Sequence, residues 1–300
     1  MKIGLRIEVS SVRGIRRGVP QLMEMLKAIG AGATFLFALG PDRSGWFAGR
    51  MLSTRIDGRW RPFGAIRRYG IGALLAGPLL PAEDLFEAYA GLMRAVRDEG
   101  FEVGVLAHDH VAWRRRASRA DAEWTRDEME HARQRFEVVF GEPPRVGGAA
   151  GWQVNRYSLR LTQRLGLDYA SDTRGQGPFI PVWQAEIVAC PQLPVTLPTL
   201  EELNADMPVD AAVARLAQLT VRPPATGHVY AASADLEGIS LSRPFEQVLQ
   251  KWLGQGYEVG SLKRYAEELP AGDLPRHEIA REELVPRFGK LAVQGREFLA

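Results

Sequence analysis

Histidine and carboxylate side chains stand at a few points of the sequence, each directly after an apolar run. These are groups that bind zinc and that serve as general acids and bases. The run His108-Asp109-His110 could bind a metal if both rings faced the same way, and would otherwise be a hydrogen-bonded loop. The other candidates, in chain order, are Glu8, Ser10, Asp172, Arg174, Asp235 and Glu237.

The apolar runs before these residues alternate with segments of helical period. Apolar residues at spacings of three and four predict amphipathic helices, and short apolar runs predict buried strands. The expected strands are 2–9, 33–39, 101–106 and 228–232, and the expected helices are 19–29, 83–98, 125–140, 155–165, 211–219 and 245–253. The alternation predicts an α/β fold with parallel strands, whose carboxyl ends would carry the active groups. No linker rich in Pro, Gly or Ser divides the chain, so we expect one domain over residues 1–300.

The composition is that of a globular protein. Of the 300 residues, 46% are hydrophobic and 25% are charged, which excludes disorder as the main state. The net charge of +2 argues against a chain built wholly for nucleic acid. Cys190 is the only cysteine, so no internal disulfide is possible and a reducing compartment is expected. The longest mostly apolar run, 71–81, is short of the roughly 20 residues that a membrane span needs, so we expect a cytoplasmic protein.

A basic and aromatic segment, Arg43–Arg68, interrupts the alternation of strands and helices. It contains seven arginines and one acid, Asp57, interleaved with tryptophan and phenylalanine. A second run, Trp113–Arg119, has four arginines. Such runs are often solvated insertions. Arginine with aromatic residues would also suit phosphates, an anionic lipid surface or, as a minor option, single-stranded nucleic acid.

Several ordered stretches carry a resemblance to one family. They are LRIEVSSVRG (5–14), GVPQL (18–22), ATFLFALGPD (33–42), FEVG (101–104), DHVAW (109–113), GAAGW (148–152), SDTRG (171–175), LPVTLPT (193–199) and LEG (236–238). In these the chain resembles the bacterial 4-deoxy-4-formamido-L-arabinose-phosphoundecaprenol deformylases, a branch of the polysaccharide deacetylase (NodB-homology) superfamily. The resemblance covers residues 2–268, with 43–68 as an insertion and 270–300 as a C-terminal tail.

The resemblance implies a distorted (β/α) barrel and a hydrolase that uses a divalent metal. The reaction would remove a formyl group from a lipid-linked aminosugar in lipid A modification and polymyxin resistance. It would take place at the cytoplasmic face of the inner membrane, where the protein could lie as a peripheral member. In the family an Asp and two His hold the metal, a carboxylate acts as base and a late His protonates the leaving amine.

This sequence departs from the family pattern at the positions that carry the chemistry. Glu8 stands for the first Asp, Ser10 for the second Asp, Leu106 for the first His and Ser233 for the late His, and only His110 remains. Leucine cannot bind a metal and serine is a poor zinc ligand, whereas catalytic zinc normally keeps three protein ligands. We therefore expect weak metal binding or none, and deformylase activity that is severely reduced or absent.

The remaining site residues follow from the same resemblance. Glu8 and Asp109 are the catalytic candidates, and the substrate-binding candidates are Trp152, Asp172, Arg174 and Glu237. Each of the latter also has a structural interpretation: Trp152 as a core residue, and Asp172 with Arg174 as an internal ion pair.

Three functional hypotheses stay open. The first is a pseudoenzyme that keeps a pocket for a lipid-linked aminosugar, a related sugar phosphate or a partner. The second is an active amide hydrolase with a rebuilt metal site made from Glu8, His108, Asp109 and His110, in which His108 replaces a tryptophan of the family. The third is a binder of anionic surfaces or nucleic acid through Arg43–Arg68, with nucleic acid the least favoured partner.

Overall fold

A parallel sheet forms the centre of the protein, seen here in a computed structural model that describes residues 1–47, 53–56, 59–62, 75, 81–269, 274–283 and 290–299. The strands follow the order β10-β1-β2-β5-β6-β7, with β11 also paired to β1, and every pairing is parallel. These strands are β1 (Lys2–Val9), β2 (Thr34–Ala38), β5 (Glu102–Ala107), β6 (Val146–Gly147), β7 (Tyr169–Ala170), β10 (His228–Ser233) and β11 (Glu258–Gly260). The predicted α/β fold with parallel strands is confirmed.

An irregular segment, 192–196, spans the space between the two edge strands β7 and β10. On one side, the Leu193 amide donates to the Ala170 carbonyl oxygen at 2.7 Å. On the other side, the Thr196 amide donates to the Val229 carbonyl oxygen at 3.0 Å. The sheet with this segment makes the distorted barrel that the sequence predicts.

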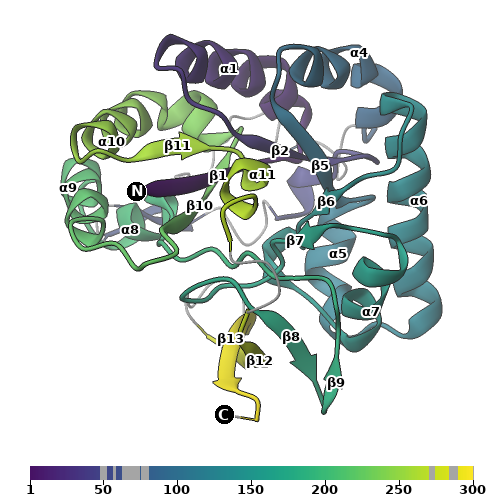
Figure 1. Ribbon diagram of the computed structural model, residues 1–300. Helices are drawn as coiled ribbons and strands as arrows, with labels where there is room; N and C mark the ends of the chain where they lie inside the picture. Colours follow the sequence, from purple (N-terminus) through teal and green to yellow (C-terminus); the bar gives the residue numbers. More distant parts are fainter. Residues whose placement is uncertain are drawn as a thin grey trace.

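Helices surround the sheet (Figure 1). They are α1 (Val19–Ala28), α4 (Leu85–Asp98), α5 (His110–Arg116), α6 (Ala122–Phe140), α7 (Arg156–Arg164), α8 (Leu200–Asp206), α9 (Val209–Leu219), α10 (Ser242–Gly254) and α11 (Leu262–Ala266). Six of them, α1, α4, α6, α7, α9 and α10, lie where the sequence predicts helices, and α5, α8 and α11 are additional. No helix among the described residues is long and apolar enough to cross a lipid bilayer.

The alternation of side chains along β1 separates the apolar core from the barrel interior. Leu5, Ile7 and Val9 are fully buried in the large core that also contains residues of α1 and α10. Successive side chains of a strand point to opposite faces, so Arg6 and Glu8 point to the other side of the sheet. Because side chains alternate along the strand, both charged side chains, Arg6 and Glu8, point into the barrel.

Two short π-helical turns follow β1 and β10 and pack against each other. They are η1 (Gly14–Gly18) and η5 (Leu236–Ser240). A Cβ atom on Gly18 would stand 1.9 Å from the carbonyl oxygen of Ala234, so only glycine fits there. This contact fixes how the two turns meet at the carboxyl edge of the sheet.

The C-terminal segment, expected as a tail over 270–300, contributes strands to a second sheet. Its order is β13-β12-β8-β9, with β8 (Ile180–Trp183), β9 (Glu186–Ile187), β12 (Arg276–Glu282) and β13 (Leu291–Glu297). The Arg174 amide donates to the Ala292 carbonyl oxygen at 3.0 Å and joins this sheet to the main body (Figure 1). The sequence pattern does not show this because neither β12 (RHEIARE) nor β13 (LAVQGRE) has a regular alternation of apolar and polar residues.

The Arg43–Arg68 segment is described only in part. Ser44–Phe47 form the 3₁₀ turn η2, and the backbone of β3 (Ser53–Ile56) pairs antiparallel with β4 (Arg59–Pro62). Residues 48–52, 57–58 and 63–68 lie outside the described residues.

Candidate functional site

The carboxyl ends of the central strands bring most of the predicted site residues to one edge of the sheet. Glu8 of β1 lies in register with Ser233 of β10 on one side and with Leu36 of β2 on the other. Ser10 directly follows β1, and His108, Asp109 and His110 directly follow β5. The family positions are therefore neighbours at this edge, as the fold requires.

A buried ion pair occupies the barrel interior beside these positions. Arg6 is 0% exposed, and its Nη2 donates to Glu8 Oε1 at 2.5 Å. Its Nη1 donates to the carbonyl oxygen of Ser171. Burial lowers the pKa of the Arg6 guanidinium, while the negative charges of Glu8 and Asp172 act in the opposite direction. The carboxylate at the first family position is thus held by an internal cation.

The other replaced positions supply no metal donor. Leu106 is 5% exposed and belongs to an apolar cluster with Leu36 and Trp113. The backbone amide of Ser233 donates to Glu237 Oε2 at 2.8 Å. Ser10 adds only a hydroxyl group, which binds zinc poorly.

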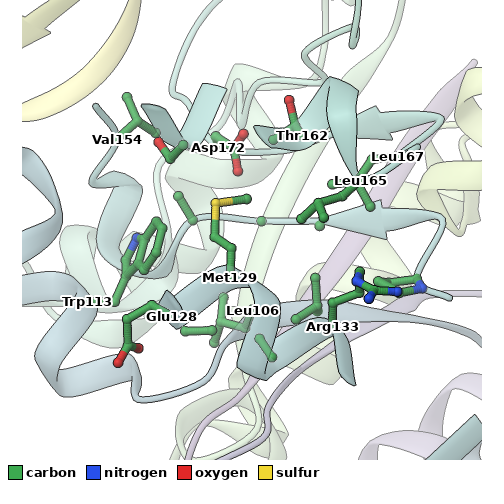
Figure 2. A pocket seen from close by; sticks show the side chains of 18 residues that line it. Leu106, Trp113, Glu128, Met129, Arg133, Val154, Thr162, Leu165, Leu167 and Asp172 are labelled. Carbon is green, nitrogen blue, oxygen red and sulfur yellow. The ribbon is translucent and has the colours of Figure 1, made fainter. Parts of the chain in front are cut away.

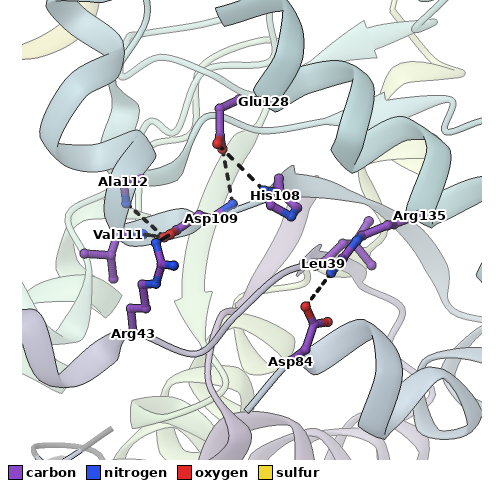
Figure 3. Close-up of polar contacts among 9 residues, drawn as sticks. All are labelled: Leu39, Arg43, Asp84, His108, Asp109, Val111, Ala112, Glu128 and Arg135. Carbon is purple, nitrogen blue, oxygen red and sulfur yellow. Dashed lines mark hydrogen bonds and ion pairs between the residues drawn. The ribbon is translucent and has the colours of Figure 1, made fainter. Parts of the chain in front are cut away.

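His110 and Asp109 lie at the start of α5. Burial, aided by the charge of Arg114, lowers the pKa of His110 to about 3, so its ring is neutral at physiological pH. Asp109 Oδ1 caps the helix by accepting from the amides of Val111 and Ala112 at 3.0 and 2.9 Å (Figure 3). Its Oδ2 accepts from Arg43 Nη1 at 2.6 Å. Both oxygens of Asp109 are therefore engaged in holding the loop.

These donors do not fit the metal of the family. Among the described residues, no three His, Cys, Asp or Glu side chains converge, as they lie, on a point where an ion could be held. Of the family positions, one neutral imidazole and one ion-paired carboxylate remain, whereas zinc sites use three or four protein ligands. The Glu8 carboxylate pairs with Arg6, the Asp109 carboxylate with Arg43, and His108 with Glu128, so the geometry gives no observation in favour of a rebuilt site made from Glu8, His108, Asp109 and His110.

Arg174 and Asp172 do not form the internal ion pair considered from the sequence. Arg174 Nη1 donates to Glu202 Oε1 at 2.9 Å, and its guanidinium lies 5.0 Å from the ring centroid of Trp152. Asp172 Oδ2 instead accepts from Gln192 Nε2 at 2.9 Å. Burial raises the pKa of Asp172. Each residue is thus fixed by a partner that sequence spacing does not reveal.

Trp152 stands in a strained turn after β6. Its φ is 53° and that of the preceding Gly151 is 63°, so two consecutive residues adopt the left-handed conformation. For a bulky residue this costs on the order of 1–2 kcal/mol. The indole Nε1 is buried without a hydrogen-bond partner among the described residues. The ring packs beside the apolar cluster of Leu106, so it is part of the core at one face and contacts Arg174 at another.

Glu237 and Asp235 are buried carboxyl groups next to β10. Glu237 is 1% exposed, and burial raises its pKa to about 7. It accepts from the Ser233 amide and from the Tyr230 hydroxyl at 3.3 Å. Burial also raises the pKa of Asp235 to about 6, and Ser11 Oγ donates to it at 2.7 Å. Both carboxyl groups fix the turn after β10.

Sequence reasoning misses Arg6, whose buried guanidinium pairs with Glu8. The available signal is its place between two core residues of a strand, Leu5 and Ile7, because alternation then turns the charge inward. What the sequence does not show is that Ser171, 165 positions away, supplies an acceptor.

A cavity of about 50 Å³ lies between β5, β6, α6 and α7 (Figure 2). Apolar side chains, among them Leu106, Trp113 and Met129, form most of its wall, and Asp172 reaches it from one end. Leu106, at the position where the resemblance expects a histidine, is thus part of the wall of this cavity.

The curated proteins similar to this chain include two of the same name. The chain is 32% identical over 248 residues, 83% of its length and 80% of the relative, to the Probable 4-deoxy-4-formamido-L-arabinose-phosphoundecaprenol deformylase ArnD of Shewanella sediminis (strain HAW-EB3). It is 24% identical over 283 residues, 94% of its length and 98% of the relative, to the protein of that name from Wigglesworthia glossinidia brevipalpis. No protein-family model matches the chain.

Solved structures share the fold at low sequence identity. A probable polysaccharide deacetylase of Pseudomonas aeruginosa PAO1 has a TM-score of 0.58 at 13% identity, covering 88% of this chain and 90% of that one. A CE4 family pseudoenzyme from Bacillus anthracis has a TM-score of 0.52 at 14% identity, with coverages of 92% and 69%. A mutant CE4 family pseudoenzyme with restored enzymatic activity has a TM-score of 0.51 at 13% identity, and this chain spans 66% of its length. The distorted barrel of the polysaccharide deacetylase type is confirmed.

Proposed function

This chain belongs to the 4-deoxy-4-formamido-L-arabinose-phosphoundecaprenol deformylase family, and from that premise we propose that it is a pseudoenzyme. It would bind a lipid-linked aminosugar, or a related sugar phosphate, without hydrolysing it. The observation that carries the proposal is the ion pair of Glu8 with the fully buried Arg6, at an edge where Ser10, Leu106 and Ser233 replace the other reactive groups.

Removal of a formyl group needs a water molecule made nucleophilic and a proton for the leaving amine. One oxygen of the Glu8 carboxylate already accepts from the Arg6 guanidinium at 2.5 Å, so this carboxylate is engaged in an internal ion pair and not free to take the proton of a water molecule. At the late histidine position, Ser233 has a hydroxyl group that does not give up its proton near neutral pH. Both proton-transfer roles are therefore impaired independently of the metal ligands.

The remaining acidic groups do not replace the lost ones. Glu237 has a pKa of about 7, which would suit a general acid, but it is 1% exposed and already accepts from Ser233 and Tyr230. Asp235 is 5% exposed and bound to Ser11. Their contacts support a role in holding the turn after β10 rather than in touching a substrate.

Two observations support ligand binding without turnover. The cavity that reaches from Leu106 to Asp172 has apolar walls with a carboxyl group at one end, and its volume of about 50 Å³ leaves room for a small substituent of a ligand rather than for a whole sugar. The Trp152 ring lies at the Arg174 guanidinium. Aromatic rings and charged groups of this kind suit the apolar faces and polar edges of a sugar. We assign substrate contact to Trp152, Asp172 and Arg174, and the positioning role to Glu237.

The place of action follows from the ligand. A lipid-linked sugar is reached from a bilayer surface, so we propose that the protein is cytoplasmic and lies at the inner face of the inner membrane. The 53%-exposed Trp46, near the start of the basic segment Arg43–Arg68, is of a type that suits a headgroup interface. We also propose that residues 1–300 act as one domain, because the second sheet is hydrogen-bonded to the barrel through Arg174.

The test restores the lost groups together and measures three quantities. The triple variant Ser10→Asp, Leu106→His, Ser233→His is compared with the unaltered chain for binding of a formamido-arabinose phospholipid, zinc content and release of formate. We expect the unaltered chain to bind the lipid and release no formate, and the triple variant to bind zinc through His110 and release formate. Each single substitution should do little because the groups act as a unit.

Release of formate by the unaltered chain, abolished by His110→Ala, would overturn the proposal in favour of an active hydrolase. Failure of the unaltered chain to bind the lipid would overturn the retained pocket. A steep fall of nucleic-acid affinity with salt in place of lipid binding would favour the anionic-surface hypothesis.

A further inference from the structure

An arginine of the second sheet reaches across to the turn that follows α5. Arg281, in β12, donates from Nη2 to the carbonyl oxygen of Ser118 at 3.0 Å and to that of Val154 at 2.8 Å. Its guanidinium also lies 5.6 Å from the ring centroid of Trp183. Three segments that are far apart in the sequence thus hold one guanidinium in place.

The charge of Arg281 is not neutralised within the part of the chain that the structure describes. Both of its hydrogen bonds are to neutral carbonyl oxygens and both use Nη2, so the Nη1 and Nε groups keep N–H donors for another acceptor. The next residue, Glu282, points to the opposite face of the strand. Partial burial lowers the pKa of Arg281, and the positive charge of Arg119 lowers it further. The surroundings of this cation therefore lack a negative charge.

Arg119 is the second cation at this place. It ends the 3₁₀ turn η3 (Ala117–Arg119), directly after the carbonyl that Arg281 binds, and its side chain is exposed. Among the described residues it forms no ion pair, and neither do Arg115 and Arg116 at the end of α5. Asp121, two residues further on, caps α6 with its Oδ1. Two guanidinium groups thus lie near each other without a carboxylate that pairs with either.

We propose that Arg119 and Arg281 bind a phosphate group. A guanidinium can donate two parallel hydrogen bonds to a phosphate, and its planar fork suits this geometry better than an ammonium does. A phosphate offers up to about two negative charges and three acceptor oxygens, whereas a carboxylate offers one charge and two oxygens. The anion would also offset the repulsion between the two cations.

The surface around this pair extends to the strained turn of Trp152. Val154, which holds Arg281, is two residues after Trp152. Arg114 of α5 packs on the same turn, since a Cβ atom on Gly151 would stand 2.8 Å from its Nε. The proposed ligands, a lipid-linked aminosugar or a sugar phosphate, both carry a phosphate group. The inference rests on that ligand class and adds the residues that hold its charged part; an anionic lipid headgroup offers the same chemistry.

The experiment measures binding of the full-length chain to two probes that lack the aminosugar. One is inorganic phosphate, followed by phosphorus NMR. The other is vesicles of phosphatidylglycerol and phosphatidylcholine in equal parts, followed by cosedimentation. We expect the chain to bind both, and Arg119→Gln and Arg281→Gln each to weaken binding at least about 10-fold.

The two variants differ in what else they change. Arg281→Gln loses contacts with Ser118 and Val154, so circular dichroism must show that it folds. Arg119 makes no hydrogen bond among the described residues, so Arg119→Gln removes the charge and leaves the packing unchanged. Arg222→Gln is the matched control, because it removes the charge of an exposed arginine after α9, on the opposite side of the barrel from α5 (Figure 1).

Selective loss with phosphate alone would support the site and assign it to a soluble sugar phosphate, and selective loss with vesicles alone would assign it to a lipid. Failure of the unaltered chain to bind either probe would overturn the inference. An equal loss in Arg222→Gln would also overturn it, because binding would then depend on net charge only. Neither probe can release formate, so each of these outcomes leaves the pseudoenzyme proposal to its own test.

Discussion

Replacement of Glu237 by glutamine should make the protein more stable at pH 8 and change the pH dependence of its stability. Glu237 is 1% exposed and accepts from the Ser233 amide and the Tyr230 hydroxyl. Glutamine keeps the shape and one oxygen acceptor, and its amide group can donate to the tyrosine oxygen. The substitution Glu237→Gln therefore removes the buried charge with little change in packing.

The magnitude follows from the pKa of this group. Burial raises it from 4.5 to about 7 in the folded protein, so the folded state holds the proton more tightly than the unfolded state does. Below pH 4.5 both states are protonated and no stability is lost. As the pH rises from 4.5 to 7 the folded state loses about 3 kcal/mol relative to the unfolded state, at 1.36 kcal/mol per pH unit, and above pH 7 the loss is constant.

The assay is urea unfolding of Glu237→Gln and of the unaltered chain between pH 4.5 and 8. The difference in unfolding free energy should grow over this range by about 3 kcal/mol in favour of the variant. Asp235, with a pKa of about 6, adds a slope to both proteins and cancels in the difference. Glu24→Gln, at an exposed site, should show no such growth. A constant difference across the range would refute the reasoning, because it would mean that ionisation of Glu237 does not lower the free energy of unfolding.

Three further substitutions test the packing around the site. Arg174→Lys should lower the free energy of unfolding in urea by about 2–4 kcal/mol, because lysine cannot keep both the contact with Glu202 and the contact with the Leu197 carbonyl oxygen. An unchanged urea midpoint would contradict the buried pair of Arg174 and Glu202. Gly18→Ala should lower the thermal midpoint sharply or prevent folding, since its Cβ would stand 1.9 Å from a carbonyl oxygen, and a stable variant would refute the contact of the two π-helical turns. Gly91→Ala is the opposite case, because no atom lies within 4 Å of the position that the added Cβ would take and the residue is inside α4. The free energy of unfolding should rise by about 1 kcal/mol, and a decrease would contradict the open surface at this position.

Local patterns were enough to predict most of the barrel. The strand over 2–9 and the helices over 19–29 and 211–219 match β1, α1 and α9 within one or two residues, because β1 is a largely apolar buried run and each helix buries one regular face. The pattern fails for β12, whose pairing with β8 depends on residues about 100 positions away, and for β13, which joins that sheet by pairing with β12. Strand pairs of that kind are stabilised by long-range contacts that leave little trace in the local sequence.

The sequence by itself determined the family and the fold, and the residue types at Ser10, Leu106 and Ser233 are the basis on which we propose that metal donors and a proton donor are lost. It did not determine the partners of the residues that remain. Only the tertiary structure paired Glu8 with Arg6 and separated Asp172 from Arg174, and only it brought Arg281 to the turn that carries Arg119. The physical reason is that hydrogen bonds and ion pairs act over a few ångströms, and the distances between side chains of separate elements are set by how the sheet and helices pack.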